Sequence, residues 1–121
     1  MKSYTDLEQS KKLLGILPRE SADMGWYYTS NLNAARNQMW VGTKAENADI
    51  PCWSLASLLN AIPKRIDKFN VLRIDIDNNN FAIWYDEIGS GVNNELPDII
   101  REYAVDACYE FILKLHELNL L

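Results

Sequence analysis

A chain of 121 residues is the size of one domain, and with 48% hydrophobic residues it can bury a core without a disulfide framework or a structural metal. Seventeen acidic and twelve basic side chains give a net charge of −5, and the basic ones are scattered, which excludes nucleic acid as an expected partner. There is no apolar signal segment and no apolar run near the ~18 residues of a membrane span, so we expect one cytoplasmic domain over residues 1–121 without membrane contact.

The first predicted element is a helix that starts with "TDLE" at residues 5–8. This motif is a capping box, in which the Thr5 hydroxyl accepts from the backbone N–H of Glu8 and the Glu8 carboxylate accepts from that of Thr5. Pro18 disfavours helical geometry at the residue before it, so we expect the helix to end near Leu17. Its apolar side is predicted to contain Leu7, Leu13, Leu14 and Leu17.

Two short strands are predicted next, at "WYYTS" (residues 26–30) and "MWVGT" (residues 39–43). Both runs are rich in aromatic and β-branched residues, which favour strands. The polar segment 31–38 between them is expected to be a fairly long connection, and a single helical turn around Ala34 and Ala35 is the alternative.

A second helix is predicted over "PCWSLASLLNAIP" at residues 51–63, with Asp49 as the N-cap and Pro51 in the first turn. Cys52 lies three residues before Leu55, which places its thiol on the side of the helix that turns inward. The apolar stripe of this helix is predicted to contain Leu55, Leu58, Leu59 and Ile62.

The segment "VLRIDIDNNNFAIWYDEI" at residues 71–88 predicts a β-hairpin, because apolar and charged residues alternate and the asparagines supply turn chemistry. We favour a two-residue turn at Asn79 and Asn80, since a three-residue turn would place Asp75 opposite Ile83 and mix the two sides. The pairs of the favoured register are Ile76 with Ile83, Ile74 with Tyr85, and Arg73 with Asp86.

The last predicted element is a helix that runs from Pro97 and Asp98, which suit a first turn, to the end of the chain. Glu110 and Lys114 have the favourable i, i+4 spacing on its exposed side. Its apolar side is predicted to contain Ile100, Ala104, Ala107, Cys108, Phe111, Leu115 and Leu118.

This order of elements predicts an α+β fold, with a mainly antiparallel sheet of about four strands packed against three helices in the order α-β-β-α-β-β-α. Cys52 and Cys108 form neither a disulfide framework nor a metal motif, so both are expected to be reduced and buried. No motif implies a cofactor.

Three segments, "ESADM", "PCWSLASLLNAIP" and "VDACYEFILKLHELNLL", resemble segments of a set of short uncharacterised proteins of Bacteroides-type gut bacteria, often associated with phage or mobile-element regions. The resemblance covers most of the chain and is weakest in "NLNAARNQMWVGTKAENA". It implies no activity, ligand or catalytic residue. A mobile-element context favours a small accessory or interaction protein over a housekeeping enzyme.

Cys52 is the candidate nucleophile, because a thiol in the first turn of a helix has its thiolate stabilised by the helix dipole. The pair Cys52-Trp53 is similar to the Cys-Trp pair of papain-like proteases, but the glycine-rich context of that motif is absent. The only histidine, His116, lies in the last turns of the predicted terminal helix, where a positive charge is favoured for electrostatic reasons. With its thiol on the apolar stripe, Cys52 is expected to be a core residue.

The stretch "DIDNNNFAIWYD" has oxygen-bearing side chains at four positions of a calcium-loop pattern. Asn80 replaces the glycine that this loop needs, and the flanking residues alternate like strands, so we expect a solvated hairpin face without a metal. The same carboxylates could act as a general acid and base if they shared a pocket. The four candidate ligands are Asp75, Asp77, Asn79 and Asp86.

The predicted strands carry more aromatic residues than one inward sheet face needs, since adjacent residues of a strand point to opposite sides. The favoured register turns Tyr85 inward and therefore Trp84 outward. Exposed Trp and Tyr are enriched at binding surfaces, and coverage by loops or helices is the alternative. The predicted binding residues are Trp84, which is the first choice, Trp26, Trp40 and Tyr28.

We therefore expect a small cytoplasmic binding module that acts through protein–protein contact, with an unknown protein partner or a second copy of itself. The alternative is a small hydrolase or transferase that uses Cys52 or the hairpin carboxylates Asp75, Asp77 and Asp86. The reactivity of the native thiol separates the two, because an inert thiol removes the cysteine enzyme.

Overall fold

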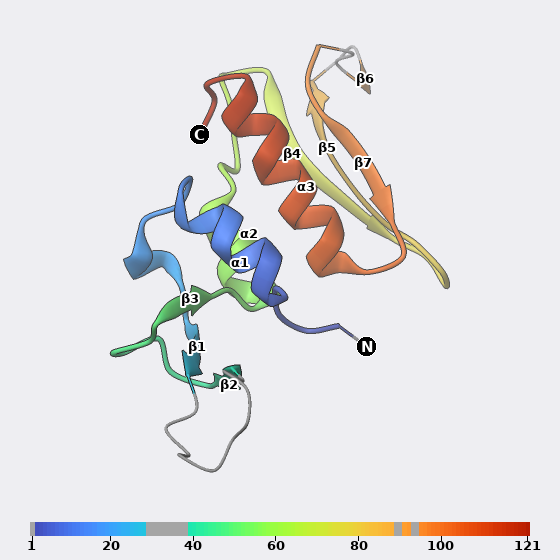
Figure 1. Cartoon of the computed structure of the whole chain (residues 1–121). Coiled ribbons are helices and arrows are strands. Elements are labelled where there is room, and N and C mark those ends of the chain that lie inside the picture. Colours follow the sequence, from blue (N-terminus) through green and yellow to red (C-terminus); the bar gives the residue numbers. More distant parts are fainter. Residues whose placement is uncertain (1, 29–38, 89–90, 93–94) are drawn as a thin grey trace.

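The computed structural model describes residues 2–28, 39–88, 91–92 and 95–121, and within them it has an α+β fold with two antiparallel sheets (Figure 1). The two sheets lie at opposite ends of the molecule, and the helices lie between them. The predicted α+β class is confirmed, whereas the prediction of a single sheet is wrong. The connection predicted at 31–38 lies outside the described residues.

The first sheet consists of β1 (Met24–Tyr28), β2 (Met39–Gly42) and β3 (Ile50–Cys52), in the order β2-β1-β3. β1 pairs antiparallel with both neighbours, and Tyr27 lies opposite Trp40. The two predicted aromatic strands are therefore confirmed.

The second sheet is built around β5 (Phe81–Glu87). β4 (Asn70–Ile76) pairs with one edge of β5, while β7 (Asp98–Arg101) and the short β6 (Gly91–Val92) pair with the other. Figure 1 shows α3 (Ala104–Glu117) lying across one face of this sheet, and α3 packs on β5 and β7. We call the face under α3 the inner face and the opposite one the outer face.

Adjacent residues of β5 alternate between these two faces. The aromatic ring of Tyr85 lies 5.4 Å from that of Phe111 on α3, and its hydroxyl donates to the carbonyl of Pro63 at 2.6 Å, which defines the inner side. Inner residues of β5 are buried in the core and outer ones are partly exposed. The inner residues are Phe81, Ile83 and Tyr85, and the outer residues are Ala82, Trp84 and Asp86.

The hairpin between β4 and β5 is confirmed, but the predicted register is wrong by two residues. The turn spans residues 77–80 because the Asp77 carboxylate caps it: Oδ1 accepts from the backbone N–H of Asn79 at 3.0 Å and of Asn80 at 2.9 Å. A shift of two residues keeps every side chain on its predicted side. The observed pairs include Ile76 with Phe81, Ile74 with Ile83, and Leu72 with Tyr85.

The first helix, α1 (Leu7–Leu14), begins one residue later than predicted because Asp6 is its N-cap. The Asp6 carboxylate accepts from the backbone N–H of Gln9 at 2.8 Å, and the Gln9 side chain accepts from that of Asp6 at 3.1 Å. Thr5 is buried instead. A short 3₁₀ helix, Arg19–Ser21, follows the helix after Pro18.

The second helix, α2 (Leu55–Ala61), is shorter than predicted, because its N-cap is Ser54, which accepts from the backbone N–H of Ser57 at 3.2 Å. Asp49 is therefore not a helix cap, and Cys52 lies in β3 rather than on a helical stripe. Pro51 is tolerated there because β3 is an edge strand.

The last helix starts at Ala104, so the prediction that it begins at Pro97 and Asp98 is wrong. Residues 98–101 form β7, in which Ile99 is buried and Ile100 is exposed, as expected of a strand. The predicted Glu110–Lys114 pair is replaced by two others: Glu110 pairs with Arg101 at 2.6 Å, and Lys114 with Glu117 at 3.9 Å.

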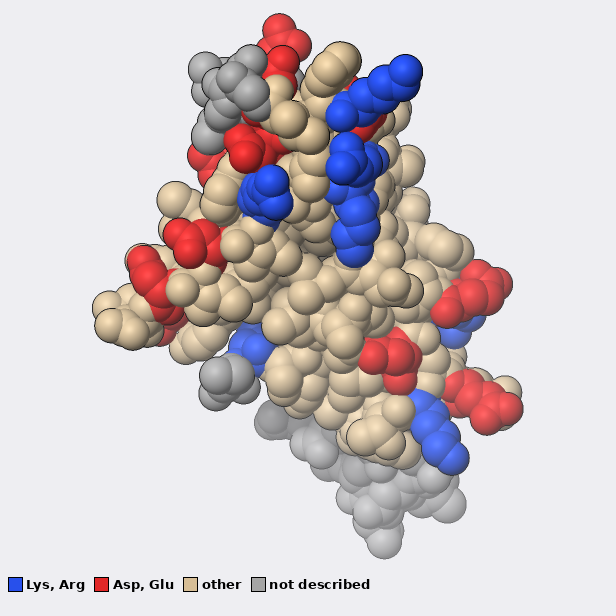
Figure 2. Space-filling view, turned by 180° about the vertical axis from the view of Figure 1, so that it is seen from behind, with Lys and Arg blue, Asp and Glu red and all other residues tan. Residues whose placement is uncertain are grey.

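Charged side chains are spread over a largely uncharged surface on the face shown in Figure 2. The basic side chains on this face gather in its upper part, and acidic side chains lie at several places around and below them. Acidic side chains lie along the projecting end of the β4–β5 hairpin, on the left of this view.

Candidate functional site

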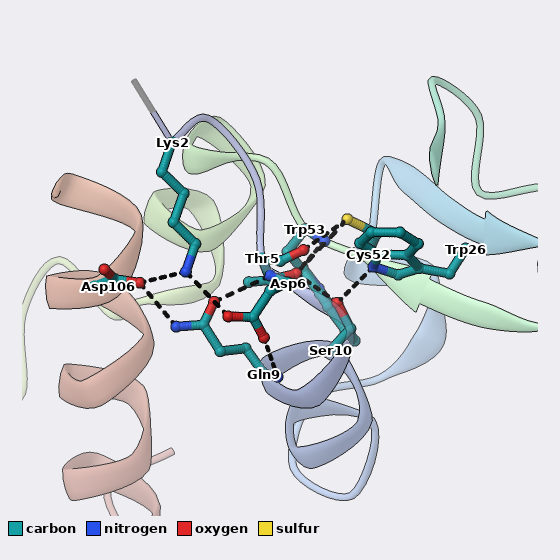
Figure 3. A network of polar contacts seen from close by, with 9 residues as sticks. All are labelled: Lys2, Thr5, Asp6, Gln9, Ser10, Trp26, Cys52, Trp53 and Asp106. Atoms are coloured by element: carbon teal, nitrogen blue, oxygen red, sulfur yellow. Dashed lines mark hydrogen bonds and ion pairs between the residues drawn. The ribbon is translucent and has the colours of Figure 1, made fainter. Parts of the chain in front are cut away.

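The thiol of Cys52 lies in a buried polar network between the N-terminal segment, α1 and the first sheet (Figure 3). Its Sγ donates to the Thr5 carbonyl at 3.4 Å and accepts from Thr5 Oγ1 at 3.7 Å. Thr5 Oγ1 also lies 2.7 Å from Ser10 Oγ, which accepts from the indole N–H of Trp26 at 3.2 Å. These hydrogen bonds fix the orientation of the thiol, which is buried from solvent.

A second part of the network fastens the N-terminal segment to α3 (Figure 3). Lys2 Nζ lies 2.6 Å from an Asp106 oxygen and 3.2 Å from Asp6, and Gln9 Nε2 donates to Asp106 at 2.9 Å. Burial alone would raise the pKa of Asp106, but the hydrogen bonds from Lys2 and Gln9 outweigh it and lower that pKa. The arrangement is that of a structural ion pair.

The two catalytic candidates are not brought together. His116 is exposed in the last turn of α3, and Figure 1 shows that this end of α3 is well separated from β3, where Cys52 lies. Burial raises the pKa of the Cys52 thiol, which is the reverse of what an activated nucleophile needs. The geometry therefore favours a core role for Cys52.

Both cysteines, Cys52 and Cys108, are buried and unpaired with each other, and burial raises the pKa of Cys108 to about 12. We expect neither to react quickly with a thiol reagent in the native protein, and both to react once the chain is denatured, because the nucleophilic thiolate is disfavoured and inaccessible. Colourimetric titration with and without denaturant measures this, and Cys108→Ala assigns the signal. Rapid labelling of native Cys52 would revive the enzyme hypothesis.

The four candidate metal ligands are spread along the hairpin. Asp75 is exposed on β4 opposite Ala82, and Asp77 is engaged in capping the turn. Asp86 lies opposite Val71 and pairs with Arg73, with 3.6 Å between Nε and Oδ2. Within the described residues, no group of three or more His, Cys, Asp or Glu side chains is placed to hold a metal ion. Asn79 contributes its backbone to the turn.

The four predicted binding aromatics do not form one surface. Trp84 lies on the outer face of the second sheet, whereas Trp26, Trp40 and Tyr28 belong to the first sheet at the other end of the molecule (Figure 1). Within the first sheet, Trp26 and Tyr28 point to one side and Trp40 to the other. Trp40 and Tyr28 are each 53% exposed, and Trp26 and Trp84 are half-buried.

The exposed ring of Trp40 has a structural partner. It stacks on Tyr27 across the β1–β2 pair, with 4.8 Å between ring centroids and 22° between their planes. The Tyr27 hydroxyl in turn lies 2.7 Å from the carbonyls of Lys44 and Glu46. This stacking contact links β1 and β2 and accounts for the position of the Trp40 ring without a ligand.

The outer face of the second sheet has different character. The Trp84 side chain lies between Arg73 of β4 and Asp98 of β7 in the sheet register, and Ile100 on the same face is 53% exposed. Protein–protein interfaces typically have an apolar centre with aromatic residues and a polar or charged rim, and this face has the same composition. The rim of this face consists of Arg73, Asp75, Asp86 and Asp98.

The inner side of β4 carries two exposed residues that the sequence pattern assigns to the core side. Ile74 is 39% exposed and Ile76 is 71% exposed, although their cross-strand partners Ile83 and Phe81 are buried. α3 covers β5 and β7, and no other described helix covers this part of β4. Alternation in the sequence predicts on which face of the sheet each side chain lies, but not how much of that face a helix covers.

A pocket of about 470 Å³ adjoins Ile76. The hairpin turn forms one wall, and the start of α3 and the N-terminal segment form the others. Its apolar lining comes from Leu55, Ile76, Phe81 and Tyr103, and its charged lining includes Lys2 and Glu102. A volume of this size is sufficient for one or two side chains of a partner or for a small ligand.

No family model, no curated protein and no solved structure matches this chain. Within the part of the chain that the structure describes, no helix is both long enough and apolar enough to cross a membrane. The function is therefore inferred from the geometry of the second sheet.

Proposed function

We propose that the chain is a small protein-binding module whose contact surface is the outer face of the second sheet, centred on Trp84. The observation that carries the proposal is that, among the described residues, α3 covers the inner face and no helix covers the outer one, where Trp84 is half-buried and Ile100 is exposed. Tryptophan is enriched among the few residues that supply most of the binding free energy of an interface. A cytoplasmic location and a protein partner, or a second copy, are parts of this proposal.

The alternative, a small hydrolase or transferase, receives less support. Its nucleophile Cys52 is buried and hydrogen-bonded to Thr5, and burial raises the pKa of its thiol. The carboxylates of Asp75, Asp77 and Asp86 do not converge on one pocket, since only Asp77 lines the pocket beside the turn. A general acid and base must both reach the same substrate.

The test compares three tagged proteins in affinity capture from the cell of origin: wild type, Trp84→Ala and Trp40→Ala. Loss of a hot-spot tryptophan costs ~2 kcal/mol or more, so partner retention should fall about thirtyfold for Trp84→Ala. Trp40→Ala, which removes an equally large side chain from the other sheet, should retain the partner. If the partner is a second copy, sedimentation should show an oligomer that Trp84→Ala dissociates. Equal retention by all three proteins would contradict the proposal.

A further inference from the structure

We propose that the free edge of β4 binds an extended segment of a protein partner in which apolar and basic residues alternate. The segment would add a strand beside residues 73–76 and extend the second sheet. This inference rests on the proposed function and specifies the partner of the same sheet. Three independent features of β4 support it: the direction of its backbone groups, its exposed isoleucines and its charge.

Within the part of the chain that the structure describes, the backbone of β4 presents unpaired groups at this edge. The N–H of Leu72 points away from β5, because it donates to the carbonyl of Lys64 at 2.9 Å. Residues of the same parity present their N–H and C=O to the same edge in an antiparallel strand, so those of Ile74 and Ile76 point outward too. The segment around Lys64 covers only the beginning of β4, and β4 is the edge strand of the sheet. An added strand could therefore make ladder hydrogen bonds with Ile74 and Ile76.

The side chains of the same two residues make the inner side of the edge apolar. Ile74 and Ile76 are exposed next to the buried Ile83 and Phe81, so an added strand would continue an existing apolar face. The pocket beside Ile76 lies on this side and can receive one of the partner's side chains. In strand addition, such pockets for alternate side chains give specificity, while the backbone bonds give affinity.

The charge at this edge is negative on the outer side. Arg73 pairs with Asp86, whereas Asp75 is exposed on β4 and Asp77 follows at the turn. Figure 2 shows acidic side chains along this projecting end of the hairpin. Opposite charges on directly facing residues stabilise a strand pair and like charges destabilise it. Basic residues of the partner should therefore face Asp75 and Asp77.

A second copy of the chain fits this edge less well. The antiparallel pairing that aligns Ile74 of one copy with Ile76 of the other places the two Asp75 carboxylates opposite each other. The pairing that aligns Ile74 with itself brings Ile76 onto Leu72, whose N–H is already held by Lys64. Asp75 therefore discourages self-pairing, as charged residues on edge strands do, while favouring a basic partner.

The experiment titrates the purified full-length protein with labelled synthetic peptides of about eight residues, an ordinary strand length. The test peptide alternates valine with lysine, a second alternates valine with glutamate, and a third has the composition of the first in a non-alternating order. We expect the first to bind at least about tenfold more tightly than the other two, as read by fluorescence anisotropy. Asp75→Lys should reverse the preference between lysine and glutamate.

A matched pair of variants tests the backbone. Ile76→Pro removes the outward N–H without removing a β4–β5 ladder bond, so it should abolish peptide binding, whereas Ile76→Val should keep it. Melting curves show whether each variant folds. If Ile76→Pro does not fold, Asp75→Lys provides the test. Equal binding of all three peptides, or no binding of any, would overturn this inference.

The outcomes also separate this inference from the proposed function. If no peptide binds but Trp84→Ala still loses the captured partner, the outer face is the binding surface and the β4 edge is not. If neither experiment shows an effect, the binding module itself is refuted. A wild-type dimer in sedimentation that Ile76→Pro dissociates would replace the basic partner with a second copy.

Discussion

Tyr85→Ala is expected to destabilise the protein by about 3–5 kcal/mol, the range for truncating a large buried aromatic residue. The side chain is completely buried, its ring packs on Phe111, and its hydroxyl donates to Pro63. The mutation removes one of the contacts between the second sheet and α3 and leaves the Pro63 carbonyl without this donor. Urea denaturation followed by circular dichroism measures the free energy of unfolding.

The adjacent residue provides the matched control. Trp84→Ala removes an even larger side chain, but from the half-buried outer face, so it should cost at least about 2 kcal/mol less than Tyr85→Ala. Tyr85→Phe keeps the ring and removes only the hydroxyl, and should cost about 1 kcal/mol. If Trp84→Ala unfolded the protein while Tyr85→Ala left it stable, the assignment of inner and outer faces would be wrong.

Trp53→Ala is expected to have an effect of similar size, about 3–5 kcal/mol, at the junction between the first sheet and α2. Trp53 is completely buried between β3 and α2, its indole N–H donates to Ser21 Oγ at 2.9 Å, and its backbone N–H donates to Thr5 Oγ1 at 3.1 Å. Truncation would leave a large cavity and remove the indole donor from the Ser21 hydroxyl, which keeps its own bond to the Pro18 carbonyl. The same denaturation measurement applies.

Trp40→Ala is the control for Trp53→Ala, because it removes the same side chain from a position that is 53% exposed. Its loss should cost no more than about 1.5 kcal/mol, the value of one aromatic stacking contact with Tyr27. Equal destabilisation by the two mutations would contradict the position of Trp53 in the core.

Local pattern in the sequence predicted the α+β class, the aromatic strands and the β4–β5 hairpin, because alternation and turn residues act over short distances. The register was missed because it depends on one side chain, Asp77, which caps residues 79 and 80. Pro51 and Pro97-Asp98 predict the first turns of helices, but the segments that contain or follow them form β3 and β7. Both pair with distant strands, and strand pairing overrides a local preference for a helix start.

The candidate site was predicted only in part. Alternation around Trp84 predicted its outward direction, and the structure places it on the outer face opposite Arg73. The exposure of Ile74 and Ile76 could not be predicted from the sequence, because it depends on which strands of the sheet α3 covers. That the chain belongs to the set of short bacterial proteins that it resembles stays a prediction.

Amide hydrogen exchange at four consecutive residues of β4 tests most directly whether this edge is open for a partner. In the isolated protein, Arg73 and Asp75 donate toward β5 and should exchange slowly, while Ile74 and Ile76 point to the free edge and should exchange fast. Addition of the alternating valine–lysine peptide should slow exchange at Ile74 and Ile76 to the rate of their neighbours. Slow exchange at Ile74 and Ile76 in the isolated protein, or no change with the peptide, would contradict strand addition at β4.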